Sequence, residues 1–118
     1  MALGAALGAC AARAQAPPAG GDAAAGETLF YDRCAMCHIA EGGGQGPSLE
    51  GLYGRRAASL PGFAFSDALK ASGLTWTGPN LDRFLTDPRA MVPGTAMPIL
   101  VADPAQRADL IAWFASRH

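Results

Sequence analysis

The pentapeptide Cys34-Ala35-Met36-Cys37-His38 decides how the rest of this sequence is interpreted. Two thiols three positions apart can add to the two vinyl groups on one edge of a porphyrin. The histidine beside the second cysteine can then bind the iron at the ring centre. C-x-x-C-H is the attachment signature of a c-type haem. The sequence therefore predicts one haem c, bound covalently through Cys34 and Cys37, with His38 as an iron ligand.

Two other uses of a C-x-x-C motif fit the sequence less well. A redox-active pair is expected within a thioredoxin-like βαβ pattern, and no strand alternation is visible. A structural zinc site needs four ligands, whereas the only other cysteine and histidine are Cys10 and His118, at opposite ends of the chain. We therefore favour haem attachment.

The composition indicates one small domain and argues against a membrane span in the body of the chain and against nucleic-acid binding. A chain of 118 residues corresponds to one domain. Half of the residues are apolar, but no run in the body of the chain is long and uncharged enough to span a bilayer. The formal net charge of −1 gives no basic surface for nucleic acid.

Residues 1–20 have the composition of an export leader and linker. A short apolar core precedes Ala14-Gln15-Ala16, which fits the A-x-A pattern of a signal-peptidase site, although no basic region comes before it. Two alternatives are a disordered tail and a lipoprotein box ending at Cys10, whose acylation would anchor the chain to a membrane. Because few residues precede Cys10, we favour cleavage and export to the periplasm. Residues 21–118 are then a single domain.

Capping residues and prolines predict an all-α domain. Helices are expected from Ala23 to Met36 after the N-cap Asp22, from Asp67 to Ser72 between Ser66 and Gly73, from Pro79 to about Thr86 before Pro88, and from Pro104 after Asp103, where Gln106 resembles part of a capping box. In the first helix, Gly26, Phe30, Cys34 and Cys37 follow the spacing of one face. The two cysteines are therefore expected at the end of a helix whose buried face continues into the haem edge.

The stretch from Ile39 to Gly54 is predicted to be loop. Its many glycines would allow the backbone to approach a flat ligand closely. Pro47 has no N–H to donate, but its carbonyl could accept a hydrogen bond from Nδ1 of His38. Such a bond would fix the imidazole tautomer and raise its basicity toward a metal.

The second iron ligand has two methionine candidates. Met91 and Met97 both lie in a stretch punctuated by proline and glycine between two predicted helices, from which a thioether can reach the opposite face of the ring. Met36 is tied to the same side as His38. Pro93-Gly94-Thr95 would stiffen the approach of Met97, which favours that residue. Either methionine could instead fill a gap in the core.

Segments along the whole domain match one family, in order. They are Gly21-Asp22 with Gly26 and Phe30, Cys34-Ala35-Met36-Cys37-His38, Gly46-Pro47-Ser48-Leu49, Gly51-Leu52-Tyr53-Gly54-Arg55, Pro61-Gly62-Phe63, Thr75-Trp76, Pro93-Gly94-Thr95-Ala96-Met97 and Leu110-Ile111-Ala112-Trp113. With these segments, the stretch from Asp22 to His118 resembles the small class I cytochromes c, near the mitochondrial and related bacterial soluble branch.

The resemblance implies a class I cytochrome c fold, with about four to five helices and Gly/Pro-rich loops wrapped around one covalent haem. It implies that His38 and Met97 are the axial ligands and that the Pro47 carbonyl holds His38. Arg55 and Trp76 would lie near a haem propionate. Gly26 and Phe30 would pack against the terminal helix.

The sequence also departs from the family pattern. Phe65 and Phe84 stand where the family commonly has tyrosines, so two phenol hydroxyls are missing. The lysines that surround the exposed haem edge of mitochondrial members are largely absent, and the matching positions hold Arg33, Arg89, Ala90 and Ala96. Fold and ligation are unaffected by these changes, but the choice of partner is open.

The residues and the resemblance together predict a periplasmic single-electron carrier and not an enzyme. It would be a monomer that docks transiently with respiratory or photosynthetic redox proteins, without a nucleic-acid partner or a small-molecule substrate. Ligation by histidine and methionine and burial of the haem both raise its reduction potential. A peroxidase would need an open iron position and a distal base, and no spare histidine is present to serve. The alternative is a dedicated cytochrome c subunit of a dehydrogenase or oxidase complex.

Overall fold

The computed structural model describes residues 20–38 and 45–117, and this part of the chain is helical. It contains α2 (Ala23–Arg33), α3 (Asp67–Ser72), α4 (Gly78–Thr86), α5 (Pro88–Met91) and α6 (Pro104–Ala115). Within these residues there is no strand, and β pairing is limited to an isolated bridge between Arg56 and Thr75. The all-α class is confirmed. The leader proposed for residues 1–20 lies, except for Gly20, outside the described residues, as do Cys10 and His118.

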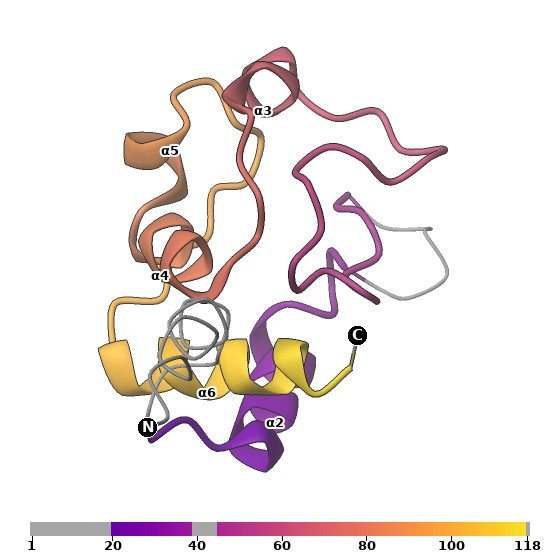
Figure 1. The fold of residues 1–118 in the computed structure, drawn as a ribbon. Coiled ribbons are helices and arrows are strands. Elements are labelled where there is room, and N and C mark those ends of the chain that lie inside the picture. Colours follow the sequence, from indigo (N-terminus) through magenta and orange to yellow (C-terminus); the bar gives the residue numbers. More distant parts are fainter. Residues whose placement is uncertain (1–19, 39–44, 118) are drawn as a thin grey trace, which may run out of the picture.

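Helices α2 and α6 cross at one end of the molecule, and their contact is very close (Figure 1). A Cβ added at Gly26 would lie 2.0 Å from the carbonyl oxygen of Asp109 and 2.9 Å from Cβ of Trp113. The Phe30 ring stacks near Trp113, with ring centroids 4.6 Å apart. Both residues therefore pack against the terminal helix, as the family resemblance implies.

Helix α2 ends at Arg33, three residues earlier than the sequence predicts. Cys34 is its C-cap, and the carbonyl of Cys34 accepts the N–H groups of Cys37 and His38 at 3.1 and 2.9 Å. The chain therefore leaves the helix in a tight turn, and the second cysteine and the histidine lie in that turn. The face that carries Gly26 and Phe30 continues only to Cys34.

Two further details differ from the expectation. The proline that ends α4 also begins α5, because Asp87 caps the new turn by accepting the N–H of Ala90 at 3.2 Å. Met91 is therefore the last residue of a short helix and not part of a loop. Gln106 does not complete a capping box in the described contacts. Its side-chain oxygen accepts from Arg33 at 3.3 Å, which links α6 to the end of α2.

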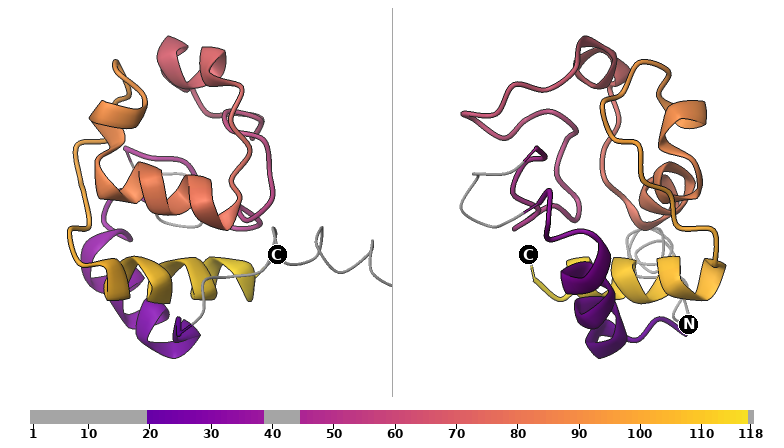
Figure 2. Two further views of the ribbon diagram at one scale, coloured as in Figure 1. Left: turned by 60° about the vertical axis from the view of Figure 1, so that its left-hand side comes forward. Right: turned by 180° about the vertical axis from the view of Figure 1, so that it is seen from behind.

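The loops and helices between α2 and α6 form two sides of the molecule (Figures 1 and 2). Residues 45–65 run along one side, and α4, α5 and the segment that follows them form the other. The core joins the two sides to α6. Ile111 of α6 is fully buried, and Val101, in the segment before α6, is 2 % exposed. No helix among residues 20–38 and 45–117 has the length and apolarity to cross a membrane.

Candidate haem site

A cavity of about 230 Å³ lies between the two sides of the molecule. Most of its wall is aliphatic or aromatic, from Leu49, Leu52, Leu60, Phe63, Phe65, Leu69, Trp76, Leu81, Phe84, Leu85, Ile99, Leu110 and Phe114. Its polar side chains include Gln45, Arg55, Arg56, Ser59, Ser66 and Thr95. An apolar wall with few polar groups is typical of a cofactor site.

One wall of the cavity carries all three residues of the predicted attachment motif. Cys34, Cys37 and His38 line it together, and both cysteines are free thiols. Burial raises the pKa of the Cys34 thiol, and the nearby positive charge of Arg33 acts in the opposite direction. The Sγ atom of Cys37 lies 4.0 Å from the side-chain oxygen of Gln45. The two sulfurs are therefore available at one edge of the cavity.

The imidazole of His38 is held in one orientation. Its Nδ1 lies 2.8 Å from the carbonyl oxygen of Pro47, the pairing considered from the sequence. Because the carbonyl can only accept, Nδ1 carries the proton and Nε2 has the free lone pair that a metal needs. Burial lowers the pKa of His38, and the Pro47 hydrogen bond opposes that shift. The neutral form that binds iron is therefore favoured.

Glycine at position 46 makes room for this ring. A Cβ at Gly46 would lie 2.5 Å from Cε1 and 2.6 Å from Nδ1 of His38, too close for any real contact. From the sequence, Gly46 is one of many loop glycines and part of a segment that matches the family, and this steric role was not predicted for it. A glycine directly before the proline whose carbonyl binds the histidine is the signal that could have identified it.

The structure places the two candidate methionines differently. Met97 lines the cavity, next to Thr95, Ala96 and Pro98. Met91 is not among the residues of the cavity wall and packs, partly buried, against the core from the end of α5. Met36 projects into solvent with 86 % of its surface exposed. Among the methionines of the described residues, only Met97 is positioned to face a group bound in this cavity.

Arg55 and Trp76 lie together on another part of the wall. The N–H of Trp76 donates to the carbonyl of Arg55 at 2.8 Å, and the N–H of Gly54 donates to that of Trp76 at 2.8 Å. The Trp76 ring packs against Phe84, with centroids 5.0 Å apart. The Arg55 guanidinium donates to the carbonyl of Glu50 at 3.0 Å. A positive group is thus held at the cavity next to an indole.

Other residues of the wall were not identified from the sequence. Arg56 follows Arg55 and also lines the cavity, as do Ser59 and Ser66. They come from loops, where no hydrophobic period shows which side chain faces inward. Phe65 and Phe84 line the cavity as well, so the absence of two phenol hydroxyls removes polar groups from the wall itself.

These residues fit a c-type haem. The thiols of Cys34 and Cys37 and the imidazole of His38, with its free Nε2, line one wall. Met97 contributes a thioether to the lining, and most of the remaining wall is apolar. Arginine side chains are present to balance propionates. The donor set is therefore complete for one iron held between a nitrogen and a sulfur ligand.

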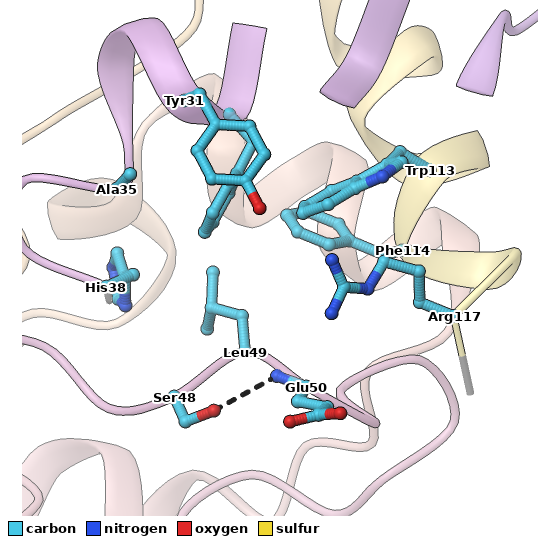
Figure 3. Close-up of a pocket in the computed structure, with 10 residues that line it drawn as sticks. Tyr31, Ala35, His38, Ser48, Leu49, Glu50, Trp113, Phe114 and Arg117 are labelled. Carbon is cyan, nitrogen blue, oxygen red and sulfur yellow. Dashed lines mark hydrogen bonds between the residues drawn. The ribbon is translucent and has the colours of Figure 1, made fainter. Parts of the chain in front are cut away.

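A second cavity of about 310 Å³ lies beside this site (Figure 3). Figure 3 shows Tyr31, Trp113, Phe114 and Arg117 around it, together with His38 and Leu49, which also line the first cavity. The guanidinium of Arg117 lies 4.6 Å from the centroid of the Trp113 ring. Neither Cys34, Cys37 nor Met97 lines this space. It does not offer the donor set of the haem site.

Comparison with known proteins points to one family. The model of the family described as Cytochrome c matches residues 23–117. Cytochrome c of Chlamydomonas reinhardtii is 44% identical over 104 residues, covering 85% of this chain and 91% of that protein. Cytochrome c2 of Rhodomicrobium vannielii is 43% identical over 104 residues, covering 85% of this chain and 82% of that protein. The solved structure of cytochrome cH from Methylobacterium extorquens is 47% identical, with a TM-score of 0.76 over 81% of this chain and 99% of that one.

Proposed function

The chain belongs to the cytochrome c family, and on that premise we propose that it is an exported carrier of single electrons whose covalent haem is ligated by His38 and Met97. That it is a small electron carrier with one covalent c-type haem follows from the family. The assignment of ligands, location and partners is our proposal. The observation that supports it most strongly is the cavity with Cys34, Cys37 and His38 on one wall and Met97 also in its lining.

The protein residues hold the haem and set its environment. Cys34 and Cys37 would form the two thioether bonds, and Nε2 of His38 would bind the iron while the Pro47 carbonyl fixes the imidazole ring. The thioether of Met97 would be the second protein ligand to the iron. The haem supplies the chemistry, because its iron exchanges one electron between two oxidation states.

The surrounding wall favours electron transfer over catalysis. With His38 and Met97 both bound to the iron, no position on it would be open to a substrate. The apolar lining excludes water and penalises the additional positive charge of the oxidised form, which raises the reduction potential. A guanidinium from Arg55 then balances a propionate at the cavity wall.

We propose that redox partners dock on the exposed residues on either side of Met97. Ala96, Pro98, Ile99 and Leu100 form an exposed apolar run directly after Thr95, with Ile99 42% and Leu100 44% exposed. Arg33 joins this run to the end of α2 by donating to the carbonyl of Leu100 at 3.3 Å. A redox protein with a complementary apolar face would dock here transiently.

We place the protein in the periplasm as a soluble carrier. Relatives named cytochrome c2 from Rhodomicrobium vannielii and Blastochloris viridis support a bacterial carrier, although relatives named cytochrome c from eukaryotes match comparably well. Cell fractionation with sequencing of the mature N-terminus tests this location. A mature chain beginning near residue 17 in the periplasmic fraction is expected. A chain retained in the membrane and acylated at Cys10 would contradict it.

A second experiment separates a carrier from a subunit. Size-exclusion chromatography of a native extract should elute the haem protein as a monomer, with a mass no greater than the 12.0 kDa of the full chain plus one haem. Redox titration of the purified protein should follow a one-electron curve. Stable co-elution with a large dehydrogenase or oxidase would show that it is a dedicated subunit.

A further inference from the structure

The segment that follows Met97 has little regular structure of its own. Pro98, Ile99 and Leu100 are exposed, and helix α6 begins only at Pro104. Val101 is different, because it is 2 % exposed and its N–H donates to the carbonyl of Leu85 in α4 at 2.8 Å. The chain that carries Met97 is therefore exposed for a few residues, where Arg33 contacts the Leu100 carbonyl, and is then buried and fixed at Val101.

Arg107 in α6 fixes this same point from the other side. One of its nitrogens, Nη1, donates to the carbonyls of Val101 and Ala102, each at 2.9 Å. Its Nε donates to Oδ1 of Asp82 in α4 at 2.8 Å. The arginine is only 9 % exposed. The guanidinium therefore links α4, α6 and the segment after Met97.

We propose that Arg107 is a positioning residue for Met97, which rests on the proposed role of Met97 as an iron ligand. Val101 is four residues beyond Met97, and four residues reach at most about 14 Å when fully extended. Anchoring Val101 thus limits how far the thioether can move from the cavity. Large movement of the segment would take two carbonyls away from Nη1 of a nearly buried guanidinium, and buried donors left without an acceptor are costly even while Nε stays paired with Asp82.

Asp82 orients the guanidinium. Its carboxylate accepts from Nε, which leaves Nη1 directed at the two carbonyls. The Asp82 side chain is 45 % exposed, so water can solvate it when the arginine is removed. Arg33 holds the neighbouring carbonyl of Leu100 at 3.3 Å, but from an exposed position where the bond contributes less.

The test is the affinity of the oxidised holoprotein for imidazole, which competes with a methionine ligand. We expect Arg107→Ala to bind imidazole about tenfold more tightly than the wild type, equivalent to about 1.4 kcal/mol. Arg107→Lys keeps the charge but cannot donate to Asp82 and both carbonyls with the same geometry, so its affinity should also rise. Asp82→Asn should give a smaller increase in the same direction.

A matched control separates positioning from general destabilisation. Oδ1 of Asp109 accepts the N–H of Asp22 at 2.9 Å, which links α6 to α2 and not to the Met97 segment. Asp109→Ala removes this acceptor, so it should lower the free energy of unfolding without changing the affinity for imidazole. If it raises that affinity as much as Arg107→Ala does, Arg107 acts only through global stability and the inference is wrong.

The outcomes for the two proposals are distinct. If Met97→Ala does not increase imidazole affinity, Met97 is not the ligand and the proposed ligation fails. If Met97→Ala increases it while Arg107→Lys and Asp82→Asn behave as the wild type, the ligation stands and the positioning role of Arg107 is overturned. Should Arg107→Ala fail to fold, these two milder variants decide the question alone.

Discussion

Replacing Gly26 by alanine should test whether the close crossing of α2 and α6 holds the haem-binding motif in place. The new Cβ would lie 2.0 Å from the carbonyl oxygen and 2.6 Å from the carbonyl carbon of Asp109, and 2.9 Å from Cβ of Trp113. Two of these three atoms belong to the backbone, so a change of rotamer cannot relieve the overlap. The two helices must instead separate by on the order of 1 Å, a gap that weakens the dispersion contacts across the crossing.

Two opposing effects determine how much Gly26→Ala lowers the free energy of unfolding. Alanine has the higher helix propensity, by about 1 kcal/mol in a helix interior. Overpacking a close contact costs up to about 3 kcal/mol, and an obstruction by backbone belongs at the upper end. The separation also disturbs the packing of Phe30 on Trp113. We therefore expect Gly26→Ala to lower the free energy of unfolding by about 2 kcal/mol or more.

Guanidinium chloride unfolding of the holoprotein, followed by far-ultraviolet circular dichroism, measures this difference. Ala24→Gly, at an exposed position of the same helix, measures the difference in helix propensity between alanine and glycine without an overlap. It should lower the free energy of unfolding by at most about 1 kcal/mol. Because α2 ends at the Cys34 cap, Gly26→Ala should also reduce the yield of protein with attached haem. A Gly26→Ala protein as stable as the wild type would refute the reasoning.

Three further predictions concern charge. Arg55→Ala should lower the reduction potential by on the order of 40 mV, the one-electron equivalent of about 1 kcal/mol. Replacing the exposed Arg83 by alanine should change the potential little. Equal shifts of the potential in the two variants, measured by voltammetry, would contradict this prediction. Burial lowers the pKa of His38 from 6.5, and binding of Nε2 to iron would oppose protonation in the same direction, so the unfolded chain takes up a proton at a higher pH than the folded chain does. Stability should therefore be complete above pH 6.5 and fall below it by at most about 1.4 kcal/mol per pH unit. Unfolding curves that coincide between pH 5 and pH 7 would refute the lowered pKa of His38 in the folded protein. Electron transfer to the native partner should depend weakly on ionic strength, because exposed apolar residues such as Ile99 and Leu100 form the proposed docking face; a steep fall in the second-order rate with added salt would contradict it.

Local capping chemistry made parts of the fold predictable to the residue. Helix α3 runs from Asp67 to Ser72 as expected, since the Ser66 hydroxyl accepts the N–H of Leu69 and Gly73 adopts a left-handed conformation with φ 68°. The end of α2 was not predictable in this way. Its termination depends on a turn in which the Cys34 carbonyl accepts two later N–H groups, and no proline or glycine in the sequence marks it.

The candidate site shows the same division between local and tertiary information. Cys34, Cys37 and His38 are adjacent in sequence, so their chemistry was readable without a fold. The residues alone favoured Met97 but left Met91 possible, because the choice depends on the path of the chain through α5 and back to the cavity. Likewise, the helical period placed Arg107 on the inner face of α6, but its bonds to Asp82 and the 101–102 carbonyls depend on how α4 and α6 pack.

The most direct test of the account is whether Met97 provides the second ligand to the haem iron. A methyl group held over a porphyrin experiences a strong ring current, so the reduced protein should show one methionine ε-methyl resonance far upfield in its proton spectrum. Met97→Ala should remove that resonance, and Met91→Ala should retain it. An upfield methyl resonance that survives in Met97→Ala, or disappears only in Met91→Ala, would contradict the ligation on which the proposed function is built.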